Sequence, residues 1–282
     1  MKAALFADVH GKLLLPFKLA ALYQQETGHQ LDVILQCGDL GAYPHLETLD
    51  KATLRHAARD RDELGFHDDF ATDKPGIRHF LEELGLRMLC VRGNHEDHDY
   101  LDHLEAQDPT QPQFPIDVYE RVWVCKSGWP QHVRTATAEL TFVGIGRIGD
   151  RKGRRDKRFI QVYEQHAIRE LYKTKQLFDV LLTHDKDDAS QRGYGMADIQ
   201  QLLDHVIFEY HFHGHTGEPF QLTPNGNGIT TTVKIKELEF GPSGVLPAGC
   251  MVILEKTATA LTLEVVPTSL TNKVTKHTWH SA

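Results

Sequence analysis

The sequence predicts a layered α/β fold in which two β-sheets pack face to face and helices lie outside them. Short apolar runs recur along the chain, and most are continuous, as in strands that are buried on both faces. Amphipathic segments with helical periodicity separate several of these runs. After residue 231 the helical patterns stop, and strand-like runs follow one another with Gly and Pro turns between them.

The predicted strands lie at 2–7, 31–36, 86–91, 118–125, 140–145, 178–183 and 208–212, followed by 233–240, 250–255 and 260–266. The predicted helices lie at 13–25, 77–84, 100–106, 163–175 and 196–206. We expect one domain over 1–282, because a chain of this length is within the ordinary range for one α/β domain. Segment 41–74 is rich in charge and His and interrupts the alternation, so it is predicted to be a helical insertion. Segment 231–267 is predicted to complete the second sheet.

The composition excludes some classes of protein. The chain has 31 Lys and Arg against 39 Asp and Glu, a formal net charge of -8, which argues against a surface built throughout to neutralise nucleic acid. No apolar run approaches the roughly 18 residues that span a bilayer, and the first apolar run is too short for a secretion signal. The four cysteines, Cys37, Cys90, Cys125 and Cys250, lie far apart and are expected to be reduced thiols. We therefore expect a cytoplasmic protein that does not enter a membrane.

Chemically active side chains follow the predicted strands, where open α/β sheets place their ligands. The chain also has 18 His, and histidine is the commonest metal ligand. Each motif alone is a weak signal, but together, in this order, they predict a metal site. The motifs are Asp8-Val9-His10-Gly11, Cys37-Gly38-Asp39, Arg92-Gly93-Asn94-His95-Glu96, Thr183-His184-Asp185 and His213-Gly214-His215-Thr216.

These residue types suit a pair of divalent cations about 4 Å apart, bridged by one carboxylate. Asp39 is the natural bridge. Asp8 and His10 would reach the first cation, metal A, whereas Asn94 and His184 would reach the second, metal B. A ligand set of carboxylate, imidazole and amide oxygen suits intermediate cations, so Mn²⁺ is expected, with Fe²⁺, Ni²⁺ and Zn²⁺ as alternatives.

The motifs DxH, GD, GNHE, a strand-ending His and a final GH resemble those of the calcineurin-like metallophosphoesterase superfamily, over about residues 1–221. The resemblance implies a four-layer αββα sandwich of two mixed β-sheets, and a phosphoesterase that attacks its substrate with a metal-bound water. It implies that His95 is the catalytic histidine, acting on the transition state or protonating the leaving oxygen. The implied ligands are Asp8, His10 and Asp39 for metal A, and Asp39, Asn94 and His184 for metal B.

The last motif departs from the GHxH pattern that is common in this superfamily. If the glycines are matched, His215 binds metal B, and Gly217 stands where the second His would bind metal A. A shift of two residues instead makes His213 and His215 the pair, since residues two apart on a strand share a face. We call the alignment that matches the glycines the first register. It is favoured because it keeps a Gly, Gly214, directly before the ligand His215.

Within the superfamily, the chain most resembles the RNA lariat-debranching branch. The resemblance rests on Leu35-Gln36-Cys37-Gly38-Asp39, an apolar Gly-Ile-Gly segment at 143–146, 178–185, and Tyr210-His211-Phe212. By this resemblance, the chain is expected to be a phosphodiesterase that acts on nucleic acid (RNA or single-stranded DNA) or on a nucleotide. A phosphomonoesterase, either a small-nucleotide or a protein phosphatase, is the alternative. A non-catalytic scaffold is disfavoured because His95 is present.

A dense basic run at 147–158 follows the apolar Gly-Ile-Gly segment, and Arg side chains bind phosphate bidentately. A solvated loop without a ligand is an equally good interpretation of such a charge run. Tyr194, between two glycines, is a candidate for stacking on a base. The candidate substrate-binding residues are Arg92, Arg151, Arg154 and Arg155. The sequence predicts no particular protein partner.

Overall fold

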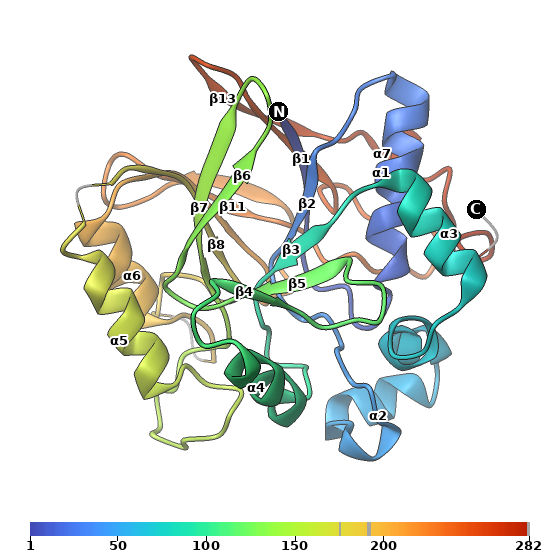
Figure 1. The fold of residues 1–282 in the computed structure, drawn as a ribbon, viewed down its shortest axis with the longest axis horizontal. Helices are drawn as coiled ribbons and strands as arrows, with labels where there is room; N and C mark the ends of the chain where they lie inside the picture. Colours follow the sequence, from blue (N-terminus) through green and yellow to red (C-terminus); the bar gives the residue numbers. More distant parts are fainter. Residues whose placement is uncertain (175, 191–192, 281–282) are drawn as a thin grey trace.

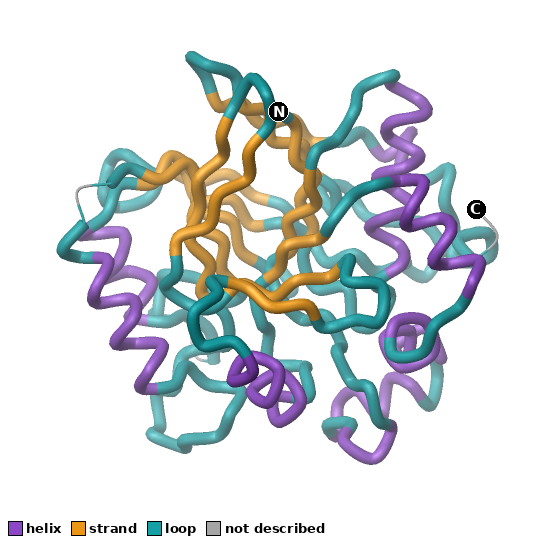
Figure 2. The backbone as a smooth tube through the Cα atoms, viewed as in Figure 1, coloured by secondary structure: helices purple, strands orange, loops and turns teal. Residues whose placement is uncertain are grey.

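Two mixed β-sheets pack against each other at the centre of the molecule, and helices flank them on both sides (Figures 1 and 2). The structure is a computed structural model that describes residues 1–174, 176–190 and 193–280. In this part of the chain, no helix is both long enough and apolar enough to cross a membrane.

The first sheet has the strand order β13-β12-β1-β2-β3-β5-β4. β1, β2, β3 and β5 run parallel, and the remaining pairs are antiparallel. Its strands are β1 (Lys2–Phe6), β2 (Val33–Gln36), β3 (Met88–Cys90), β4 (Gln113–Pro115), β5 (Val122–Cys125), β12 (Val252–Lys256) and β13 (Leu261–Val265).

The second sheet has the order β10-β11-β9-β8-β7-β6, and β7, β8, β9 and β11 run parallel. Its strands are β6 (Pro130–Arg134), β7 (Glu139–Ile145), β8 (Phe178–Thr183), β9 (Phe208–His213), β10 (Gln221–Pro224) and β11 (Thr231–Lys234). The parallel strands of both sheets are mostly buried on both faces, which explains their continuous apolar sequences.

Three apolar layers hold the four layers of secondary structure together. The middle layer lies between the sheets and joins Leu5 and Leu35 of the first to Phe142, Leu182 and Phe212 of the second. A second layer packs helices of the N-terminal half against the first sheet. A third packs α5 and α6 against the second sheet. The predicted αββα sandwich is therefore confirmed.

The five predicted helices are all present, with ends shifted by a few residues. The helix predicted at 163–175 ends at Leu171, and Lys175 lies outside the described residues. The α-helices are α1 (Leu14–Thr27), α2 (Lys51–Ala57), α3 (Pro75–Leu84), α4 (His98–Gln107), α5 (Val162–Leu171), α6 (Ala197–His205) and α7 (Thr268–Thr271). Segment 41–74 contains α2, the short 3₁₀ helices η1 (Leu46–Thr48) and η2 (Arg61–Leu64), and the π-helix η3 (Phe66–Phe70).

The prediction for segment 231–267 was wrong in its choice of sheet. Only β11 joins the second sheet, where it lies parallel to β9. β12 and β13 extend the first sheet instead, because β12 pairs antiparallel with the free edge of β1, with Leu5 opposite Val252. An alternating apolar pattern defines which face of a strand is buried but does not say which sheet edge receives it.

The C-terminal segment fastens the insertion to the body of the protein. The indole of Trp279 is fully buried against the first sheet's helical layer. Its Nε1 donates to Asp62 Oδ2 in the insertion (3.0 Å), and its carbonyl oxygen accepts from Lys18 Nζ of α1 (2.6 Å). One residue thus links three separate parts of the chain.

Trp279→Ala is expected to destabilise the protein by about 3–5 kcal/mol, because it removes a buried indole and leaves Asp62 without its indole donor. Denaturant unfolding measures this loss. Trp129→Ala is the control, since Trp129 is only partly buried. Equal losses in the two variants would show that Trp279 has no special anchoring role.

Candidate metal centre

The predicted motifs converge where the parallel strands of both sheets end. Asp8 and His10 follow β1, Asp39 follows β2, His184 follows β8, and His215 follows β9. Carboxyl ends of parallel strands share one edge of their sheet, so two facing sheets bring five strand ends together, that of β3 included.

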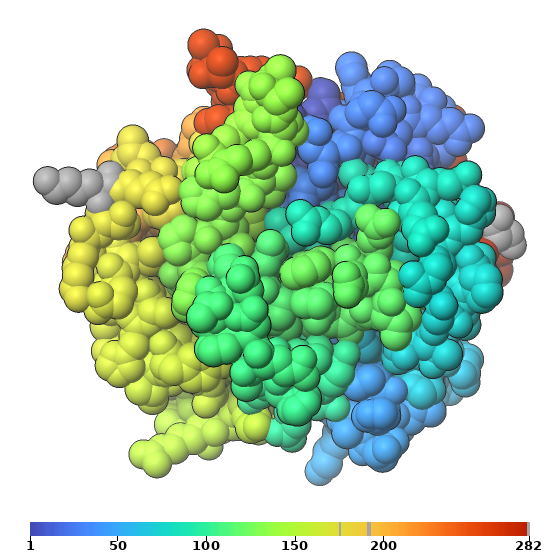
Figure 3. All heavy atoms as spheres, in the orientation of Figure 1, coloured from blue at the N-terminus to red at the C-terminus, as the bar shows by residue number. Residues whose placement is uncertain are grey.

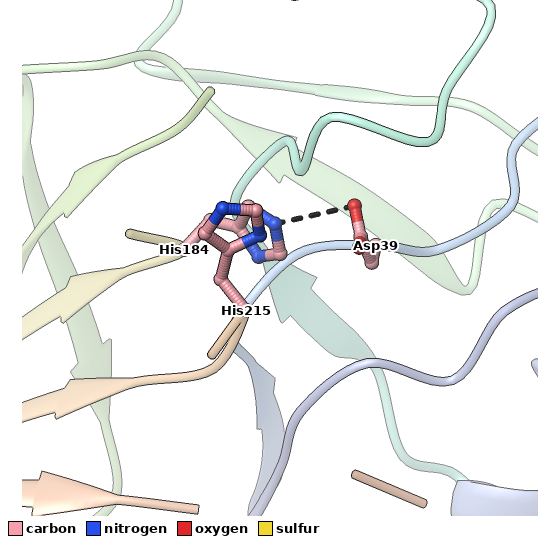
Figure 4. Close-up of side chains that lie close together, drawn as sticks. All are labelled: Asp39, His184 and His215. Atoms are coloured by element: carbon pink, nitrogen blue, oxygen red, sulfur yellow. Dashed lines mark ion pairs between the residues drawn. The ribbon is translucent and has the colours of Figure 1, made fainter. Parts of the chain in front are cut away.

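Two compact groups of potential ligand atoms form at this edge, and Asp39 belongs to both. One contains Asp8, His10 and Asp39, and the other contains Asp39, His184 and His215. In each group the ligand atoms lie within 4.8 Å of one another. Figure 4 shows the second group, in which His184 Nε2 lies 3.2 Å from Asp39 Oδ1. This is the arrangement expected of a carboxylate that bridges two cations.

Asn94 lies beside the second group. Its side-chain Oδ1 is 3.1 Å from His184 Nε2, and its backbone N–H donates to Asp39 Oδ1 (2.7 Å). The amide oxygen is therefore close to the same imidazole and carboxylate that would hold metal B.

Glycines allow the strand ends to approach so closely. A Cβ at Gly38 would lie 2.6 Å from His184 Nδ1, and a Cβ at Gly93 would lie 2.1 Å from Asp39 N. A Cβ at Gly214 would lie 2.5 Å from the Asp8 carboxylate. No real Cβ tolerates these distances, so the glycines are required by the geometry of the ligands.

The candidate ligands have unusual backbone conformations. Asp8, His10, Asp39 and His215 all have positive φ, at 48°, 42°, 55° and 67°. Such conformations are rare for residues with a Cβ, and they cluster where function requires a fixed geometry. Four of the seven non-glycine residues with positive φ in the described chain are thus candidate ligands.

Glu96 fixes two of the loops that carry ligands. Its carboxylate is buried and accepts from the backbone N–H groups of Leu40 (2.9 Å), Ala42 (3.0 Å) and Gly93 (3.0 Å). Burial and the nearby Asp39 raise the pKa of Glu96 to about 7. The sequence motif contains Glu96 but does not reveal this role.

The charges of the ligands depend strongly on one another. Burial raises the pKa of Asp39, but the adjacent His184, His95 and His10 outweigh it and hold the carboxylate ionised. Burial lowers the pKa of His184, but Asp39 and Asp8 outweigh it and raise the value to about 9. A cation would take the place of the proton on His184, since metal ligands must be deprotonated.

His215 provides a direct test of whether a metal fits. Its Nε2 is buried and has no hydrogen-bond partner among the described residues, whereas its backbone N–H donates to both oxygens of Asp8 (3.0 Å each). A buried imidazole nitrogen without a partner is costly unless it binds something else, such as a metal. The ring lies 4.7 Å from that of His184. The donor set and this orphaned nitrogen both fit a divalent cation.

His213 does not join either ligand group in the described chain. It is buried, its Nδ1 lies 3.2 Å from the carbonyl oxygen of Gly214, and its ring packs beside His211. This placement favours the first register, in which His215 and not His213 is a candidate ligand.

His215→Ala is expected to remove one bound metal and most activity, whereas His213→Ala is expected to keep both metals. Metal content per chain, measured by elemental analysis after gel filtration, separates the two variants. Because His213 is buried, its truncation also costs some stability, so stoichiometry is a safer readout than rate. Equal metal loss in the two variants would favour the alternative register.

His95 lies at the mouth of the centre, next to His10. Their ring centroids are 5.7 Å apart, and both residues line one cavity of about 180 Å³. His95 Nδ1 is 2.6 Å from Asp50 Oδ2, at the N-terminus of α2 in the insertion, and Tyr43 Oη donates to the same oxygen (3.0 Å). Burial lowers the pKa of His95, but Asp50 and Asp39 outweigh it and raise the pKa to about 9. These two carboxylates therefore favour the protonated form of His95.

The candidate substrate-binding arginines fall into two classes. Arg92 is buried, and its guanidinium pairs with Asp102 (2.6 Å) and Glu105 of α4. Arg147, at the start of the basic run, is also buried and pairs with Asp102 (2.8 Å) and Glu164 (2.9 Å). The contacts of Arg92 favour a structural role, because they tie α4 to the end of β3 and leave no free face for a phosphate.

Arg151, Arg154 and Arg155 are exposed and lie in the loop before α5. Figure 3 shows this loop and the insertion at the same end of the molecule, on opposite sides of α4. Arg151 donates to the carbonyl oxygen of Tyr194, and the Tyr194 ring packs edge-on against His215, with centroids 5.1 Å apart. The basic loop is thereby connected to the candidate ligand group that contains His215.

Asp185, next to His184, joins the basic loop to the loop that carries Tyr194. Its carboxylate accepts from the backbone N–H groups of Gly149 (3.0 Å) and Gly195 (2.7 Å). A Cβ at Gly149 would lie 2.5 Å from the carbonyl oxygen of Gly195, so the loops are in direct contact. The THD motif indicated the position of Asp185 but not its contacts.

No family model matches the sequence, and no curated protein matches it. The crystal structure of TT1561 of Thermus thermophilus superposes with a TM-score of 0.53 and 15% identity, over 95% of this chain and 98% of that protein. The chain has the calcineurin-like phosphoesterase fold. A 5'-nucleotidase from Candida albicans SC5314 matches with a TM-score of 0.43 and 11% identity, over 96% of this chain and 53% of that protein. At 15% identity, the likeness to TT1561 shows the fold alone.

Proposed function

We propose that this chain is a binuclear metal-dependent phosphoesterase, and specifically a phosphodiesterase that acts on nucleic acid or on a nucleotide. The observation that carries the proposal is the position of Asp39 in both ligand groups, which suits a carboxylate bridge between two cations. Mn²⁺ is the proposed metal, with Fe²⁺, Ni²⁺ and Zn²⁺ as alternatives, because the ligands mix carboxylate, imidazole and amide oxygen. When bound, the two cations would supply the Lewis acidity that activates water and neutralises charge on the phosphate.

The roles of the chain's own groups follow from their positions. Asp8, His10, Asp39, Asn94, His184 and His215 would hold the cations. His95 would donate its proton to the leaving oxygen as the phosphorus–oxygen bond to the leaving group breaks. The new bond joins phosphorus to the oxygen of water, and the proton that the water loses passes to solvent. Asp50 keeps the imidazole of His95 oriented and protonated.

A diester substrate with further phosphates is supported by the exposed basic loop. Arg151 contacts Tyr194, whose ring packs against His215, and Arg154 and Arg155 lie in the same exposed loop, where a continuing phosphate backbone would meet cationic side chains. Tyr194 offers an aromatic ring beside His215 on which a base could stack. The free, buried cysteines suit a reducing compartment, so a cytoplasmic location belongs to the same proposal.

Hydrolysis of an aryl phosphodiester by metal-stripped protein, with Mn²⁺, Fe²⁺, Ni²⁺ and Zn²⁺ added in turn, tests the proposal. We expect activity only with added metal, highest with Mn²⁺, and abolished by chelator. RNA and single-stranded DNA follow as substrates, with an Arg151→Ala, Arg154→Ala and Arg155→Ala triple variant for comparison. The triple variant should lose activity on the polymers and keep it on the aryl diester.

Two results would contradict the proposal. Full activity of the metal-stripped protein would exclude the binuclear centre. Hydrolysis of an aryl phosphomonoester without hydrolysis of the diester would instead identify a phosphomonoesterase that uses the same ligands.

A further inference from the structure

The proposed ligand set is unequal between the two cations. Metal B would have Asp39, Asn94, His184 and His215, whereas the motifs supply only Asp8, His10 and Asp39 for metal A. Gly217 stands two residues after His215, at the place where the superfamily pattern has its second imidazole. Its φ is +70°, and it has no side chain to offer.

A carboxylate fills the space in front of Gly217. A Cβ built on Gly217 would lie 3.2 Å from Glu237 Oε1. Lys236 holds this arrangement, because its Nζ donates to the carbonyl oxygen of Gly217 (2.8 Å) and lies 3.3 Å from Glu237 Oε2. The two segments that follow β9 and β11 therefore meet at Gly217 and Glu237.

The backbone places Glu237 next to the first ligand of metal A. Glu237 forms a parallel bridge with Ala7, and the N–H of Leu238 points to the carbonyl oxygens of Ala7 (3.1 Å) and Asp8 (3.2 Å). The Glu237 side chain lines the same cavity as His10 and His95. It thus faces the side of the centre on which metal A would lie.

From this geometry we infer that Glu237 is the fourth protein ligand of metal A and replaces the imidazole that is missing at position 217. The inference rests on the binuclear centre proposed above. The Glu237 carboxylate lies outside the compact group of Asp8, His10 and Asp39, so it must change rotamer to bind. Its side chain is 25% exposed, and a partly exposed ion pair such as that with Lys236 contributes little, so the change is inexpensive.

Charge also favours a carboxylate here. Lys234 is buried, and its Nζ lies 3.9 Å from Asp8 Oδ2, so a positive charge already stands beside the metal A group. A cation next to this ammonium group requires more negative charge than Asp8 and the shared Asp39 provide. Glu237 would supply that charge directly at the metal.

Calorimetric titration of metal-stripped protein with Mn²⁺ tests the inference without an activity assay. We expect two sites in the wild type, and in Glu237→Gln a loss of about tenfold or more in the affinity of one site. Glu218→Gln is the matched control, because Glu218 directly follows Gly217 but its carboxylate accepts from Thr216 Oγ1 (3.1 Å). Its two affinities should stay within about twofold of the wild type. Thermal melting of the metal-free variants checks that both fold.

A repeat at high salt separates ligation from a distant charge effect. Salt screens the field of an uncoordinated carboxylate, whereas a coordinate bond is much less sensitive. The difference between wild type and Glu237→Gln should therefore persist. A difference that vanishes at high salt, or superimposable titrations at low salt, would overturn the assignment of Glu237 and leave the binuclear centre intact. Fewer than two sites in the wild type would overturn both.

Discussion

Asp39→Ala is expected to lower kcat on an aryl phosphodiester by about 10³-fold or more and to reduce bound metal from two ions to one or none. Asp39 belongs to both ligand groups, so its loss weakens both cations at once. It also accepts the backbone N–H groups of Asn94 (2.7 Å) and His95 (2.9 Å), which hold two further functional side chains in place. A loss of 10³-fold corresponds to about 4 kcal/mol of transition-state stabilisation.

Asp39→Asn separates the contribution of the bridging charge from that of the hydrogen bonds. An amide keeps an oxygen that can accept the two backbone N–H groups, but it removes the negative charge. If the bridge is the main role, Asn and Ala should be similarly inactive. Asp179→Asn is the control for folding, since Asp179 lies on β8 but pairs with Lys256 (2.6 Å), which takes no part in the centre. Near wild-type rates in Asp39→Ala would exclude the bridge, because the centre cannot assemble without it.

The candidate ligands that the structure brings together could be predicted because each lies in a short motif after a strand. Asp8, His10 and Asp39 each follow a predicted strand in a short motif. Parallel strands end at a common edge of the sheet, so these residues are expected to lie close together. The order of the predicted strands along the chain also predicts two sheets. The sequence did not predict which edge strands pair with each other. β12 is as apolar as a strand of either sheet, and only its partner β1 shows where it belongs.

The groups that support the ligands were missed because their contacts span long distances in the sequence. Asp50 lies in the insertion, 45 residues before the histidine that it contacts, and nothing in its local sequence marks it. Glu237 lies in a segment in which charged and apolar residues alternate, the pattern of an ordinary strand with one exposed face. The short strands β4, β6 and β10 were also missed, since three to five residues with few apolar positions give a weak signal.

The insertion therefore has a consequence for chemistry that its sequence did not reveal. Asp50 both caps α2, accepting from Ala52 N (2.8 Å) and Thr53 N (2.7 Å), and holds His95. Asp50→Asn is expected to lower kcat by about tenfold with little change in KM, because the imidazole loses its orientation and its stabilising charge. Asp50 acts through His95, so the same substitution in His95→Ala should have little further effect on kcat.

His95→Ala is expected to lower kcat by about 10²-fold or more and to leave metal content unchanged, because a proton donor acts on the transition state and does not hold the cations. The loss should depend on the leaving group. A nitrophenolate leaves without much help from an acid, whereas an alkoxide needs a proton, so the ratio of wild-type to variant rates should rise as the leaving group becomes more basic. A series of aryl and alkyl diesters measures that slope. Equal losses across the series would exclude proton donation by His95, and loss of metal would make His95 a ligand instead.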